Sequence, residues 1–213
     1  MPAARESLLN AALAALRDQP WSGIRMVDVA SAAGVSRQTL YNEFGSKDGL
    51  ARALVRREAD AYLRGVERLM AQSAGAADRL VSVVEWTVAE ARTRPLLRAL
   101  LTGCWGERLP VPRPVRGGTV LSRVPAQRRA DARLPGPAEL VAAVRDRSRA
   151  APGHGRRPGD RTGEPGDLPQ RCELAVRLAL SLVVAPAEGS VAQLVRAAVG
   201  DGLSATRPRA EDR

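Results

Sequence analysis

Two short helical segments joined by a tight turn constrain the fold of this chain more than any other feature. Small and apolar residues predict a first helix over 26–33, and Gly34 ends it because glycine tolerates the left-handed backbone that commonly closes a helix. Ser36 is expected to begin a second helix over 37–44, since its hydroxyl can accept an N–H group of the first turn. Gly34, Val35 and Ser36 together predict the sharp crossing of a helix-turn-helix.

Apolar spacing gives this helix-turn-helix an inner and an outer face. The residues expected to converge on one small core are Val29, Ala30, Ala33, Val35, Leu40 and Phe44. Polar side chains remain outside near the N-terminal end of the second helix, which is the end that enters a major groove of DNA. These outward residues are Arg37, Gln38, Thr39, Tyr41 and Asn42. The pattern therefore predicts contact with double-stranded DNA.

Side-chain chemistry indicates how these residues would contact DNA. Arg37 suits N7 and O6 of guanine and Gln38 suits adenine, with solvation or contact with phosphate alone as the alternative for both. Thr39 offers a methyl group and a hydroxyl. Lys47 lies beside a helix N-terminus, where anions bind readily. The residues suited to phosphates, which position a helix without reading sequence, are Tyr41 (whose alternative is packing), Asn42 and Lys47.

Most of the remaining chain also predicts helices. Aromatic residues make up only 3% of the sequence, so the core must be built mainly from Ala, Leu and Val, and this composition favours helices over sheets. We therefore expect an all-α fold. The further helices are expected over 4–18, from 47 towards Met70, and over 78–93, 95–102, 173–185 and 190–199.

Residues 103–168 interrupt this helical pattern. They hold 9 of the 15 Pro, 10 of the 19 Gly and 13 Arg against 7 acidic residues, and only Ala138–Arg147 keeps a weak helical pattern. Such a composition buries too little apolar surface to offset the entropy of ordering the chain. Three interpretations stay open: a disordered basic loop that adds nonspecific DNA affinity, irregular but partly ordered helices, or translation in a shifted reading frame.

Net charge is compatible with DNA binding without demanding it. The chain carries a formal charge of +10, which suits a nucleic acid or an anionic membrane surface as partner. However, Lys47 is the single Lys against 32 Arg, which is also typical of a GC-rich genome.

The sequence offers little material for other chemistry. His154 is the only His and has no companion at ligand spacing, and Cys104 and Cys172 are too isolated for a zinc site or a disulfide scaffold. We therefore expect no catalytic residue, no metal and no cofactor. The N-terminus lacks an apolar signal-peptide core, and no apolar run approaches the ~18–20 residues of a membrane span. A cytoplasmic protein that does not enter a membrane is expected.

Residues 5–70 resemble the N-terminal region of TetR/AcrR-type regulators. The resemblance rests on the run VDVASAAGVSRQTLYNEFGSKDGL, in which turn, core, Leu-Tyr pair, Phe and Gly-Ser-Lys fall in register. The helices at 173–200 resemble the dimerisation pair of the family more weakly. Two positions depart from the family. Arg25 replaces a common capping Ser or Thr and is expected to contact phosphate instead, and Asn42 replaces a frequent His.

The resemblance implies a homodimeric regulator, with a repressor as its usual form. Two recognition helices would bind a palindromic operator about one DNA turn, ~34–36 Å, apart. Residues 1–46 would form the helix-turn-helix domain, and residues 47–203 a helical ligand-binding and dimerisation domain containing the irregular segment 103–168. Carried over by position, the DNA-contacting set is Arg25, Arg37, Gln38, Thr39, Tyr41, Asn42 and Lys47.

An apolar effector pocket in the second domain is also implied by the resemblance. Trp86, Leu97 and Leu101 are its candidate lining, although residues of this kind more often belong to a plain core. The alternative function is a DNA-binding module with a degenerate sensor and no ligand response. An enzyme or a basic membrane-surface protein would need catalytic motifs or a cationic amphipathic helix that the sequence does not contain.

Overall fold

In the computed structural model, residues 2–72, 75–113, 134–150 and 168–199 are described, and within these ranges all regular structure is helical. The predicted all-α fold class is confirmed. Contacts divide the chain into two compact units, residues 1–64 with 90–140 and residues 65–89 with 141–213. Three of the described helices contribute residues to both units.

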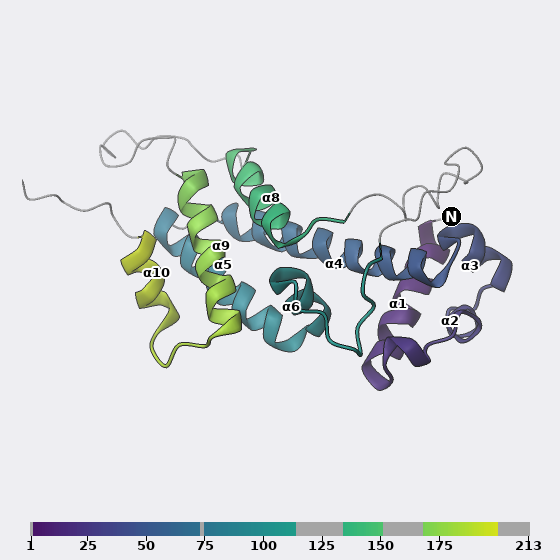
Figure 1. The fold of residues 1–213 in the computed structure, drawn as a ribbon. Coiled ribbons are helices and arrows are strands. Elements are labelled where there is room, and N and C mark those ends of the chain that lie inside the picture. The colour runs from purple at the N-terminus through teal and green to yellow at the C-terminus, as the bar shows by residue number, and fades with distance from the viewer. Residues whose placement is uncertain (1, 73–74, 114–133, 151–167, 200–213) are drawn as a thin grey trace, which may run out of the picture. The chain divides into compact units, whose positions relative to one another are not determined.

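The first unit begins with a three-helix group, here called the head (Figure 1). It contains α1 (Pro2–Asp18), a 3₁₀ turn η1 (Trp21–Gly23), α2 (Met26–Ala32) and α3 (Arg37–Phe44). Each helix packs against the other two. The predicted bounds of these helices agree with the structure to within two residues, because local signals at Pro20, Gly34 and Ser36 terminate or cap them.

Three more elements contribute to the first unit. They are the first part of α4 (Lys47–Met70), the end of α5 (Ala76–Thr93) and α6 (Pro95–Thr102), which begins with Pro95 as expected. Arg57 of α4 holds α1 by donating to Asn10 Oδ1 at 2.7 Å and to the Leu9 carbonyl at 3.2 Å. The Trp21 N–H donates to the Arg108 carbonyl at 2.9 Å and so ties η1 to the segment after α6.

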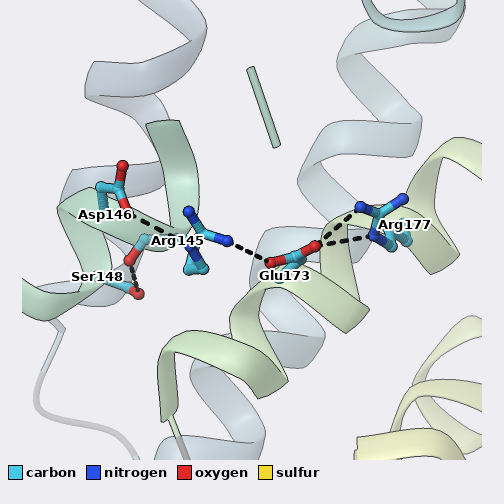
Figure 2. A network of polar contacts seen from close by, with 5 residues as sticks. All are labelled: Arg145, Asp146, Ser148, Glu173 and Arg177. Atoms are coloured by element: carbon cyan, nitrogen blue, oxygen red, sulfur yellow. Dashed lines mark hydrogen bonds and ion pairs between the residues drawn. The ribbon is translucent and has the colours of Figure 1, made fainter. Parts of the chain in front are cut away.

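The second unit contains the remainder of α4 and α5 together with α8 (Pro137–Ala150, from residue 141), α9 (Leu168–Val184) and α10 (Val191–Val199). Figure 2 shows how charged side chains link α8 to α9. Glu173 accepts from Arg145 at 3.3 Å and from Arg177 at 2.8 Å. The hydrogen bond from Arg177, with the charges of both arginines, holds the pKa of Glu173 below its ordinary value against the opposing effect of burial. The ion pairs of Glu173 that link α8 to α9 are therefore fully formed above the ordinary pKa of a glutamate, and they are lost as the pH falls through the lowered pKa of Glu173.

The segment 103–168 is more ordered in part than its composition predicts. Residues 103–113 are non-helical, but α8 extends beyond the weak pattern at 138–147 and buries Leu140, Val141 and Val144. The helix predicted to start at 173 begins at Leu168 instead. The three interpretations of this segment also concern residues 114–133 and 151–167, and these lie outside the described residues.

The crossing of α4 and α5 in the second unit depends on one glycine. A methyl group added at Gly65 would lie 2.1 Å from Cη2 of Trp86. We expect Gly65→Ala to lower the free energy of unfolding by about 1–3 kcal/mol, although alanine favours an isolated helix by about 1 kcal/mol. Urea denaturation followed by circular dichroism measures this. Gly189→Ala, where a methyl group meets open space, is the control. Equal stability of Gly65→Ala and the parent would contradict the packing.

Candidate nucleic-acid interface

The turn between α2 and α3 has the geometry that the sequence predicts. Gly34 has φ +66°, in the left-handed region that favours glycine, and the Val35 N–H donates to the Ala30 carbonyl at 3.1 Å. Ser36 caps α3, because its Oγ accepts from the Thr39 N–H at 3.0 Å. Gly45, with φ +72°, closes the helix. Both ends of α3 are therefore fixed by local interactions.

The core of the head lies beneath α3. Val29, Ala30, Leu40 and Phe44 are at most 2% exposed, while Ala33 and Val35, also predicted for this core, are half-buried. Since Leu40 and Phe44 are four residues apart, they occupy one face of α3 and turn the opposite face outward. Gln38 and Asn42 lie on that outward face and are exposed. Arg37, in the first turn of α3, and Tyr41 are also exposed, and Thr39 is half-exposed.

Two of the outward residues are ordered by hydrogen bonds within the turn and helix. Gln38 donates from Nε2 to Asn42 Oδ1 at 3.0 Å, one helical turn away. This contact uses one amide hydrogen of Gln38 and leaves the other hydrogen and the oxygen for a base edge. Thr39 Oγ1 lies 2.9 Å from Ser36 Oγ, so its hydroxyl belongs to the cap while its methyl group remains for other contacts.

Arg25 lies at the N-cap of α2, where its side chain makes no capping hydrogen bond. It instead donates to Asp28 through Nε at 2.7 Å and Nη2 at 3.1 Å, and both residues are exposed. The hydrogen bond that Arg25 donates to Asp28, followed by the charge of that carboxylate, raises the pKa of Arg25, with burial acting in the opposite direction. A phosphate at this position would have to compete with the Asp28 carboxylate.

Lys47 has a structural contact that sequence reasoning did not foresee. Its Nζ donates to the Ser22 carbonyl at 3.1 Å and lies 5.4 Å from the centre of the Trp21 ring. Partial burial lowers the pKa of Lys47, while the charge of Asp48 acts in the opposite direction. Lys47 therefore links the start of α4 to η1, besides lying at a helix N-terminus.

The packing role of Gly49 in this region was not predicted from the sequence. A methyl group there would lie 1.9 Å from the carbonyl oxygen of Phe44, so only glycine allows the first turn of α4 to approach the end of α3 this closely. Arg5 of α1 adds a second restraint, with its guanidinium 4.7 Å from the Phe44 ring centre and 3.3 Å from Glu43. A Gly two residues after the Gly-Ser-Lys run was the available signal.

The residues predicted for an effector pocket belong to different units. Leu97 and Leu101 are buried in the first unit, and Trp86 packs against Gly65 in the second. A cavity does exist within the first unit, but it is lined by other residues, including Leu13, Leu16 and Glu58. The pocket assignment of these three residues stays a prediction.

The described part of the chain holds few side chains that suit catalysis or metal binding. His154 lies outside the described residues. Cys104 is exposed and Cys172 is buried, and burial raises the pKa of Cys172 to about 11 against an opposing hydrogen bond from Ser148. Among the described residues, no His, Cys, Asp and Glu side chains gather in a group of three able to hold a metal ion. None of the described helices has the length and apolar content needed to cross a membrane.

A capped helix with an outward polar face, set on a tight glycine turn, is the arrangement that defines a helix-turn-helix DNA-binding domain. Residues 8–54 match the family described as bacterial regulatory proteins, tetR family. This match covers the helix-turn-helix and the start of α4, the part of the chain whose sequence resembles the same family.

Relatives with curated descriptions support the same assignment. The chain is 40% identical over 100 residues to the HTH-type transcriptional regulator AlkX of Mycobacterium tuberculosis, covering 46% of this chain and 47% of the relative. A second HTH-type transcriptional regulator of that species, itself described as uncharacterised, is 33% identical over 99 residues, covering 46% and 49%. The matches thus span about half the length of these relatives. The fold is similar to the TetR family repressor AlkX from Dietzia sp., with TM-score 0.52 and 22% identity over 92% of this chain and 90% of that chain.

The cap of α3 gives a direct test of how the interface is ordered. We expect Ser36→Ala to lower the free energy of unfolding by about 1 kcal/mol, because the Thr39 N–H loses its acceptor. Thermal unfolding followed by circular dichroism measures the change. Ser31→Ala, at an exposed position near the end of α2, is the matched control and is expected to change little. Equal melting temperatures for the two variants would show that the cap contributes nothing.

Proposed function

We propose that this protein is a sequence-specific DNA-binding transcriptional regulator that inserts α3 into a major groove. The observation that carries the proposal is that Arg37, Gln38, Tyr41 and Asn42 of α3 are all exposed, while Leu40 and Phe44 anchor the same helix in the core. Arg37 would read guanine, and Gln38, oriented by Asn42, would read adenine. The methyl group of Thr39 would contact a base edge beside them.

Phosphate contacts would position the helix. Tyr41 is 39% exposed and Asn42 is exposed on the same face, so both suit this role. Lys47 would contribute through its place at the start of α4, and Arg25 by exchanging Asp28 for a phosphate. These contacts are expected to be independent of sequence and sensitive to salt.

A homodimer formed through α9 and α10 would present two copies of α3 to a palindromic operator. Support comes from large apolar side chains on the outer surfaces of these helices, where Leu174 is 44%, Val184 64% and Leu194 41% exposed. Arg171 of α9 also donates to the Val199 carbonyl at 3.0 Å, which braces α10 against α9. Burying such exposed leucines and valines against a second copy would be favourable.

The remaining assignments follow from the match of residues 8–54 to the tetR family and from the curated relatives. Residues 1–46 would form the DNA-binding domain and residues 47–203 the regulatory and dimerisation domain of a cytoplasmic repressor. Because the relatives are transcriptional regulators, no enzymatic activity is proposed. An apolar small molecule would relieve repression. The second candidate, a regulator without a working sensor, is favoured by the unusual composition of 103–168 and predicts DNA binding that no ligand changes.

Replacing a base-reading residue and replacing a phosphate-contacting residue should have different effects on DNA binding. Arg37→Ala is expected to relax preference at one base position and to cost about 1–3 kcal/mol on the preferred site. Tyr41→Ala should instead weaken binding to all sequences alike, since it removes a phosphate contact. Fluorescence anisotropy with the preferred site and its single-base variants distinguishes them. Arg98→Ala, an exposed arginine outside the head, is the control. Unchanged affinity and base preference for Arg37→Ala would contradict the proposed reading role.

A further inference from the structure

A cavity of about 670 Å³ lies within the first unit, beside the head. Its volume falls in the range of about 300–1,000 Å³ that is typical of small-molecule sites. Its walls come from α1, α4, the junction of α5 with α6, and the segment after α6. None of its lining residues belongs to α3 or to the residues that the sequence predicted for an effector pocket.

Apolar side chains make up much of the wall. They are Leu13, Leu16, Pro95, Leu96 and Leu109. Leu13 and Leu16 of α1 are only half-buried, whereas Leu8, Leu9 and Ala12 of the same helix are at most 2% exposed. The leucines that face the cavity therefore keep apolar surface that an apolar ligand could cover.

The wall also contains an ion pair between Glu58 and Arg94. Glu58 is only 6% exposed, and its Oε1 lies 2.8 Å from Nη2 of Arg94, which also contacts Glu90 at 2.5 Å. Because the buried carboxylate of Glu58 already has this partner, a ligand is not needed to neutralise it. A ligand group at this depth would have to be neutral to avoid breaking the pair.

Two cations border the outer part of the cavity. Arg17 and Arg108 both line it and are exposed, and neither makes an ion pair with any carboxylate that the structure describes. The backbone of Arg108 is held in place, since its carbonyl accepts from the Trp21 N–H at 2.9 Å. The cavity lining thus combines apolar side chains with two exposed arginines that make no ion pair within the described part of the chain.

We propose that this cavity binds a single-chain anionic amphiphile, with the apolar chain against the leucines and the anionic group between Arg17 and Arg108. A bound chain would contact α1 of the head and the start of α6 together. Occupancy would therefore alter how the head is held and weaken DNA binding. Only this last step rests on the proposed function.

Isothermal titration calorimetry with the full chain and no DNA tests the site. The probe is dodecanoate below its micelle concentration, with dodecan-1-ol and dodecyltrimethylammonium as the neutral and cationic arms. We expect dodecanoate to bind most tightly, and the double variant Arg17→Ala/Arg108→Ala to weaken it about tenfold. Arg98→Ala, an exposed arginine of α6 that does not line the cavity, should leave binding unchanged. Equal binding by parent and double variant, or equal binding of the cationic probe, would overturn the proposal.

A second variant tests the location. Leu109→Trp adds bulk at a half-buried, non-helical position of the wall and should abolish dodecanoate binding while circular dichroism shows an unchanged helix content. Undiminished binding would place the ligand elsewhere and overturn the assignment.

DNA affinity measured with and without dodecanoate tests the regulatory step. We expect saturating dodecanoate to weaken the DNA complex of the parent but not that of the double variant. An unchanged complex would overturn the regulatory step. A chain that never binds DNA would instead refute the proposed function and leave the calorimetric result standing.

Discussion

The packing around Phe44 determines how α3 is presented. Its ring is 2% exposed at the end of α3, with the Arg5 guanidinium of α1 4.7 Å from the ring centre. Its carbonyl oxygen meets the first turn of α4, where a methyl group at residue 49 would approach to 1.9 Å. Three helices therefore meet at one residue. Any shift of α1 or α4 at this point would change the orientation of the outward face of α3.

The orientation of α3 also depends on a second contact between α1 and α4, further along both helices. Arg57 of α4 holds α1 at Asn10 and at the Leu9 carbonyl. Leu13 and Arg17 of α1, which line the cavity, lie one and two turns beyond Asn10, and Glu58 follows Arg57 directly. The proposed ligand site and the proposed DNA-reading helix therefore share one helix pair. This shared support is the physical basis for expecting the two sites to affect each other.

Local signals explain why the head could be predicted from the sequence. Ser36 caps α3 and the positive-φ glycines at 34 and 45 end α2 and α3, so short-range chemistry fixes the helix bounds. The start of α9 at Leu168 was predicted five residues too late, because Pro169 and the Gly-rich run before it indicated a loop, although proline is tolerated in a first helical turn.

Interactions between distant residues could not be predicted in the same way. Lys47 contacts a carbonyl 25 positions earlier, and the cavity joins segments from residue 13 to residue 109. Apolar leucines at helical spacing look the same in sequence whether they face a core or a cavity. Leu97 and Leu101 illustrate this ambiguity, since both are buried and neither lines the cavity.

Selection of bound sequences from a random pool of double-stranded DNA tests the central claim most directly. If α3 reads bases and the protein binds as a homodimer, the recovered sequences will share an inverted repeat. Its half-sites will have centres about 10 base pairs, or one helical turn, apart. Recovery of no common sequence at any salt concentration, while the protein remains folded, would contradict the account.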